Sequence, residues 1–189
     1  MGFSGGLVVV RCDGDALELE ALQQDEPEWP EEPSPPSATW YVAGQGWQVV
    51  NLWSELPDEP EEFLQALALE TGSPTMLAVI LDSDTAYVTA FGTSSGVSEG
   101  WIEARSAAGY ASRGAPLPGG PTAGAGERVW FEWIDGRLPD HADELAAWAE
   151  AAGLRGDREQ ILSVMRGDEG RVEDRFLRLL MALGVPPRS

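Results

Sequence analysis

The chain has no lysine, and between Arg11 and Arg105 it has no basic residue of any kind. The 93 residues from Cys12 to Ala104 hold 19 of the 32 carboxylates, whereas the rest of the chain combines 13 carboxylates with all 12 arginines. A long stretch of one sign sets up a negative field that repels phosphate and attracts cations or basic proteins. Because each contact to a nucleic-acid phosphate needs a cation, the sequence predicts no nucleic-acid binding.

Cysteine and histidine are nearly absent, since Cys12 and His141 are the only ones. Together they supply at most two of the four ligands of a tetrahedral zinc site, and a single cysteine forms no internal disulfide. The sequence also contains no zinc-protease helix motif, phosphate-binding loop or dinucleotide-binding glycine motif. It therefore predicts no cofactor.

Long apolar runs are missing as well. None is long enough for a transmembrane helix, and the N-terminal run after Met1 is too short, and lacks the positive flank, for a signal peptide. We expect a cytoplasmic protein that does not bind membranes. The absence of lysine beside 22 glycines is also typical of a GC-rich genome, and an acidic, lysine-poor surface is typical of salt-adapted proteins.

An ordinary apolar fraction, 43% of 189 residues, is enough for a substantial core, so we expect one domain over residues 1–189. β-Branched and alternating apolar patterns predict six strands, four of them in two antiparallel pairs. The expected strands are Gly6–Cys12, Thr39–Ala43 and Trp47–Trp53 as a hairpin, Thr75–Leu81 and Thr85–Phe91 joined at Asp82–Asp84, and Arg128–Ile134 ending at a turn at Asp135-Gly136.

Helical periodicity and capping residues predict a helix over residues 58–71, stopped by Gly72 and Pro74. Further helices are expected over 15–24, from Asp140 to about 152, over 157–166 and over 168–183, whereas 101–110 fits either a helix or irregular structure. The fold class is therefore α+β: a mainly antiparallel sheet with one packed helix (about 58–71), followed by two or three C-terminal helices. Residues 1–136 are expected to be mostly β and residues 137–189 helical.

The segment 25–37, DEPEWPEEPSPPS, holds five prolines and five carboxylates, which is incompatible with a helix or a central strand. We expect an exposed loop whose Trp29 either contacts a partner or folds back on its own domain. The candidate partner-binding residues lie in this loop and at the start of the 58–71 helix. They are Glu26, Glu28, Trp29, Glu31, Glu32, Glu59, Glu61 and Glu62.

Two weaker features could carry chemistry. Asp82 and Asp84 at the expected hairpin tip are candidates for a cation site or an acid–base pair, although such residues are also favoured by tight turns. Ser94 lies in a G-x-S-x-G match with His141 downstream, which is the order of a hydrolase triad. However, the residues after Ser94 make a poor helix start, and we expect His141 to be an exposed residue in a first helical turn. No catalytic residue is assigned.

These observations favour a non-enzymatic, acidic protein-interaction module that binds a cationic protein, in the manner of an immunity protein, an inhibitor or a DNA mimic. One alternative is a small hydrolase or metal-dependent enzyme centred on Asp82 and Asp84 or on Ser94 and His141. Another is an accessory or scaffold protein whose charge serves only solubility.

Overall fold

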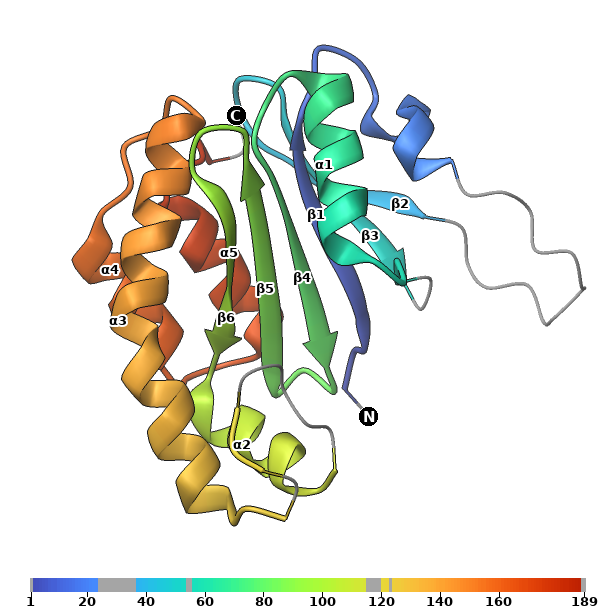
Figure 1. Cartoon of the computed structure of the whole chain (residues 1–189). Coiled ribbons are helices and arrows are strands. Elements are labelled where there is room, and N and C mark those ends of the chain that lie inside the picture. Colours follow the sequence, from blue (N-terminus) through green and yellow to red (C-terminus); the bar gives the residue numbers. More distant parts are fainter. Residues whose placement is uncertain (1, 24–36, 54–55, 115–119, 123, 188–189) are drawn as a thin grey trace, which may run out of the picture.

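A computed structural model describes residues 2–23, 37–53, 56–114, 120–122 and 124–187 (Figure 1). A six-stranded sheet in the order β2-β3-β1-β4-β5-β6 forms its centre, and every neighbouring pair of strands is antiparallel. The strands are β1 (Gly5–Arg11), β2 (Ala38–Val42), β3 (Trp47–Trp53), β4 (Thr75–Leu81), β5 (Thr85–Gly92) and β6 (Gly96–Ile102). The helices are α1 (Pro60–Thr71), α2 (Ala104–Ser112), α3 (Glu127–Ala151), α4 (Arg158–Arg166) and α5 (Val172–Ala182).

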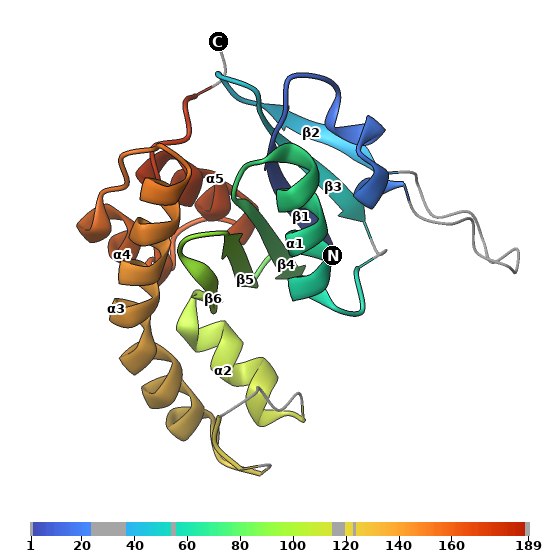
Figure 2. The ribbon, with the colours of Figure 1, turned by 45° about the horizontal axis from the view of Figure 1, so that its top comes forward.

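The α+β class with C-terminal helices is confirmed. The two central strands, β1 and β4, are the ones that are apolar on both faces, because helices cover the sheet on both sides. Alternate residues of β1 divide the core. Val8 and Val10 pack under α1, whereas Leu7 and Val9 belong to the cluster beneath α3–α5. Figure 2 shows the sheet between α1 on one side and α3, α4 and α5 on the other.

The α1 side is the thinner layer. Pro60 occupies the first turn of α1, and Gly72 ends the helix with a φ of 65°, as glycine allows, so the helix expected over 58–71 is confirmed. Leu64 and Leu67 are fully buried against the sheet. Beside α1, the expected helix over 15–24 is two short 3₁₀ turns, Ala16–Glu18 and Glu20–Leu22, the first capped by Asp15.

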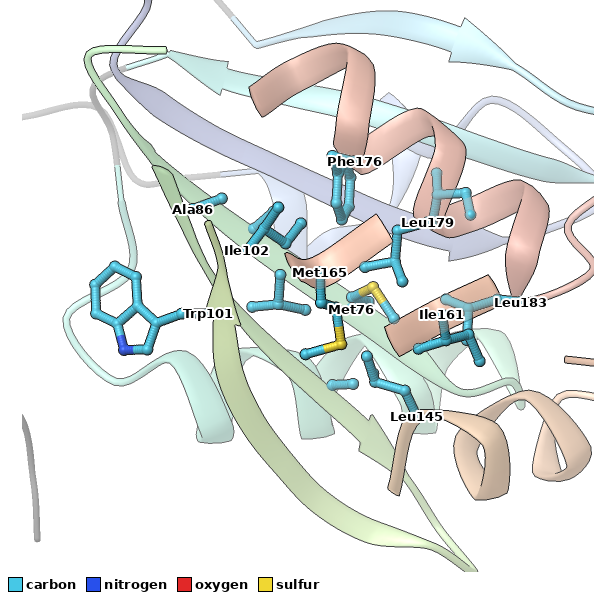
Figure 3. Close-up of a cluster of buried hydrophobic side chains, with 14 of the residues drawn as sticks. Met76, Ala86, Trp101, Ile102, Leu145, Ile161, Met165, Phe176, Leu179 and Leu183 are labelled. Carbon is cyan, nitrogen blue, oxygen red and sulfur yellow. The ribbon is translucent and has the colours of Figure 1, made fainter. Parts of the chain in front are cut away.

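The helical side holds the larger core. Side chains from the sheet, including Met76 and Ile102, meet Leu145, Ile161 and Phe176 from α3, α4 and α5 (Figure 3). The buried indole of Trp148 donates to the carbonyl oxygens of Thr75 (3.0 Å) and Phe91 (3.1 Å), which ties α3 to β4 and β5. No helix in the described part of the chain has the length and apolar character needed to cross a bilayer.

The strand expected over 128–134 is wrong: these residues form the first two turns of α3, which continues through Asp135, Gly136 and Pro139. The four-residue spacing of Trp130, Ile134 and Leu138, all buried, prevails over the strand preference of the aromatic residues. The boundary expected at residue 136 between a mostly β part and a helical part therefore falls inside α3. The undecided segment 101–110 divides into the end of β6 and most of α2.

Candidate functional site

The α1 side of the molecule is acidic throughout. Residues 12–23 and 56–73, which form this side, carry nine exposed carboxylates and no basic side chain. These are Asp13, Asp15, Glu18, Glu20, Asp58, Glu59, Glu61, Glu62 and Glu70. Two of them support the fold: Asp15 caps a 3₁₀ turn, and Glu70 accepts hydrogen bonds from the backbone N–H groups of Glu20 and Ala21. The side chains of the other seven make no hydrogen bond or ion pair with any described residue. We call this surface the acidic α1 face.

Three of the predicted partner-binding residues lie on this face. Glu59 precedes α1, and Glu61 and Glu62 lie in its first turn, where carboxylates complement the positive end of the helix dipole. The other five, Glu26, Glu28, Trp29, Glu31 and Glu32, lie outside the described residues. The structure describes the chain only up to Gln23, after the second 3₁₀ turn, and again from Ser37, directly before β2.

Sequence reasoning missed Leu69, the most exposed large apolar side chain of the described residues at 73%. It lies on the solvent side of α1, seven residues after Glu62 and thus on the same helical face. The helical spacing could have revealed it, because Leu69 is out of phase with the buried Leu64 and Leu67. An exposed leucine among carboxylates gives this face an apolar contact point as well as charge.

The helical side has a different electrostatic character. From Arg105 onward the sequence has 13 carboxylates and 11 arginines, and its charges are partly paired. Arg128 pairs with Glu132, Arg158 with Asp143, and Arg166 with Asp135. Among the described residues these are the only ion pairs, so the acidic α1 face takes part in none.

The predicted tight turn between β4 and β5 forms, with Asp82 and Ser83 at φ values of 55° and 61°. The side chain of Asp82 accepts from the N–H of Gly2 (3.2 Å), and the hydroxyl of Ser4 accepts from the N–H of Asp82 (2.9 Å). These contacts hold the N-terminal segment against the turn. Within the described ranges, no group of three or more histidine, cysteine, aspartate or glutamate side chains is arranged to hold a metal ion.

The Ser94 and His141 pair is not assembled. Ser94 is exposed in the turn between β5 and β6, so a strand follows it where a nucleophile elbow needs a helix. His141 is 3% exposed inside α3, which contradicts the expected exposed position in a first helical turn. Neither ring nitrogen has a hydrogen-bond partner among the described residues. Ser94 is therefore not hydrogen-bonded to it.

His141 borders a small cavity of about 60 Å³ between α3 and β6. Tyr87 and Trp101 border it with their rings tilted by 51° and the ring centroids 4.8 Å apart, and the guanidinium of Arg137 lies 5.1 Å from the centre of the Trp133 ring. Burial, together with the positive charge of Arg137, lowers the pKa of His141 to about 3. His141 is therefore neutral at physiological pH, and the cavity has room for little more than a water-sized group.

Of these features, only the acidic α1 face gathers several exposed side chains of one kind on a single surface. The described residues of the Asp82–Asp84 turn support the fold locally, and Ser94 and His141 are separate. Comparison of the chain with protein-family models, curated proteins and solved structures gave no significant match.

Proposed function

We propose that this protein is a non-enzymatic interaction module whose acidic α1 face captures a cationic protein in the cytoplasm. The observation that carries the proposal is the set of nine exposed carboxylates on this face with no basic side chain among them. Such a surface steers a basic partner into contact and raises its association rate. Inhibitors or immunity proteins that neutralise basic nucleases or toxins, and DNA mimics, work on this principle.

Charge alone gives fast association but weak retention, because exposed ion pairs contribute little and are screened by salt. Apolar contacts that lose water on binding would slow dissociation. Leu69 is suited to this role, since its side chain is already exposed on the helix that also carries Glu62 and Glu70. The proposal therefore assigns the association rate to the carboxylates and part of the residence time to Leu69.

The test begins with capture of binding proteins from native lysate of the source organism at about 50 mM and 500 mM salt, a range over which the Debye length falls by about threefold. A captured basic protein is then purified, and its association rate is measured against salt by surface plasmon resonance. We expect the rate to fall by about tenfold or more across this range.

Two variants localise the interaction. One replaces Glu59, Glu61 and Glu62 by glutamine. The other replaces the exposed Glu127, Asp140 and Glu150 of α3 by the matching amides, which changes the net charge equally on the opposite side. A separate variant replaces the five predicted residues of the 25–37 segment by serine. We expect the α1 variant to associate more slowly than the α3 variant, with both melting at similar temperatures. Equal rates for the two, or no specific basic partner, would refute the proposal.

A further inference from the structure

Two cavities lie between the edge strand β2 and helix α5, on the side of the sheet away from the acidic α1 face. The larger, of about 540 Å³, is bordered by the first residues of both elements, among them Ala38, Trp40 and Glu173. The smaller, of about 140 Å³, is bordered by later residues of both, including Tyr41, Leu177 and Met181. Because the order along β2 matches the order along α5, the two cavities follow one another. We call them together the β2–α5 groove.

The carboxylate of Glu173 is the unusual feature of the larger cavity. Its side chain is 9% exposed, and its Oε1 atom accepts a hydrogen bond from the Ser83 hydroxyl at 2.5 Å. Its Oε2 atom is buried and has no partner among the described residues. A buried carboxylate oxygen without a donor is costly, so a ligand donor that the oxygen reaches when the Glu173 side chain turns toward the cavity would be strongly favoured.

The surroundings of Glu173 suit a cation. Asp174 adds a second carboxylate to the cavity wall, whereas the exposed Arg171 supplies one guanidinium and makes no ion pair within the described part of the chain. Trp40 also borders the cavity, at the irregularity between Thr39 and Tyr41 in β2, and is 43% exposed. Aromatic faces attract guanidinium and ammonium groups.

The other end of the groove is apolar. Leu177 and Leu180 form its wall together with Val185, and Met181 on its rim is 55% exposed. At a rise of 1.5 Å per residue, Leu177 and Met181 lie about 6 and 12 Å along α5 from Glu173. An extended chain advances about 3.3 Å per residue, so about two to four residues separate a side chain at Glu173 from one at the apolar end.

We propose that the β2–α5 groove binds an extended segment of the cationic partner. A basic side chain of that segment contacts Glu173 and the ring of Trp40, and an apolar side chain about three residues away enters the cavity beside Leu177 and Met181. This inference rests on the proposed function for the charge of the partner. It adds a second contact region with its own sequence preference, whereas the acidic α1 face selects mainly for charge.

The probe for this groove is the tetrapeptide acetyl-Arg-Ala-Ala-Leu-amide, titrated into the isotope-labelled full chain and followed by NMR. The matched peptide carries citrulline, which has the shape of arginine without its charge. We expect the arginine peptide to shift the Trp40 indole and Met181 methyl signals and to bind about tenfold more tightly than the citrulline peptide. Absence of shifts at both residues, or equal binding of the two peptides, overturns the groove proposal.

Variants identify the contacts. Glu173→Gln retains an acceptor for the Ser83 hydroxyl and is expected to weaken the arginine peptide about tenfold while leaving the citrulline peptide unchanged. Glu127→Gln, on the exposed start of α3, makes the same change in net charge and should have no effect. Trp40→Ala and Met181→Ala alter exposed side chains, so they test both ends of the groove even if Glu173→Gln destabilises the fold. An unchanged affinity in both contradicts the proposal.

The two proposals fail separately. If the tetrapeptide does not bind while a purified basic partner still associates in a salt-dependent way through Glu59, Glu61 and Glu62, the groove is wrong and the acidic α1 face stands. If the tetrapeptide binds as described but no salt-dependent partner exists, the groove is a peptide site and the proposed function is wrong.

Discussion

The buried His141 makes the stability of the protein depend on pH in a way that one substitution should remove. In the unfolded chain this histidine has a pKa near 6.5, whereas in the folded protein burial and Arg137 lower it to about 3. The unfolded chain therefore binds more protons between these values. The contribution of neutral His141 to the free energy of unfolding is therefore complete above pH 6.5 and is lost progressively as the pH falls toward 3.

The size of the effect follows from the shift. One pKa unit corresponds to about 1.4 kcal/mol, so the free energy of unfolding contributed through His141 should fall by about 2 kcal/mol between pH 7.5 and pH 5.0. Leucine has a similar volume and no titratable group. We expect the His141→Leu variant not to show this fall between pH 7.5 and pH 5.0. Because the substitution also removes two unpartnered nitrogens, it should change the free energy of unfolding at pH 7.5 by no more than about 1 kcal/mol.

The measurement is urea unfolding of both proteins at pH 7.5, 6.0 and 5.0, with tryptophan fluorescence as the probe. The lower limit stays above the isoelectric point of about 4.1. Carboxylates that titrate in this range act in both proteins, so the difference between the two curves isolates His141. The other titratable or charged side chains at the cavity are Tyr87, Glu99 and Arg137, and a Glu99→Gln background controls for the carboxylate that borders the cavity. If the free energy of unfolding falls with pH equally in both proteins, His141 gains its proton as readily in the folded state as in the unfolded chain, and the lowered pKa is wrong.

Three further predictions concern single positions. A Cβ atom at Gly100 would lie 1.7 Å from Nδ1 of His141, so Gly100→Ala should lower the free energy of unfolding by about 1–3 kcal/mol in chemical denaturation, and His141→Ala in the same chain should recover part of the loss. Asp157 accepts from two N–H groups at the start of α4, so Asp157→Ala should cost about 1 kcal/mol in the same assay, whereas a cost near zero would show that water replaces the cap. Leu69→Ser should leave the melting temperature within about 1–2 °C, because the side chain is exposed, yet should speed dissociation of a basic partner; an unchanged dissociation rate would exclude Leu69 from the interface.

Local signals were sufficient for β1 to β5 and for α1, whereas β6 was not predicted. From Met76 to Leu81 the strand is apolar at every inner and outer position, and a central strand covered on both faces accommodates that pattern. The turn residues after it and the proline and glycine around α1 fix where these elements begin and end. Each signal lies within about a dozen residues of the element that it predicts.

The start of α3 shows where local signals fail. Trp130, Phe131 and Trp133 favour a strand, and Gly136 and Pro139 suggest an interruption. The helix forms because Trp130, Ile134 and Leu138 bury one continuous stripe against the rest of the core. Tertiary burial then outweighs the cost of a glycine and a proline within the helix. A longer window, extending to Trp148, would have revealed the helical spacing.

The candidate sites were only partly predictable for the same reason. The charge of the acidic α1 face follows directly from the sequence. In contrast, the burial of His141 depends on its close approach to Gly100, and the unpartnered oxygen of Glu173 depends on how α5 meets the β4–β5 turn at Ser83. These contacts join residues 41 and 90 positions apart in the chain, so no local pattern indicates them.

The placement of the carboxylates bears on whether the charge is only a device for solubility. Salt adaptation or solubility would favour an acidic excess over the whole surface, because every exposed face meets the same solvent. Here the residues from Arg105 onward have nearly balanced charges and three ion pairs, whereas the acidic α1 face has no cation. Concentrating one sign on one face raises the electrostatic repulsion within the folded state. Solubility or salt adaptation does not require the carboxylates to gather on one face. Recognition of a cationic partner does, because only an uneven charge distribution gives the approaching protein a preferred orientation.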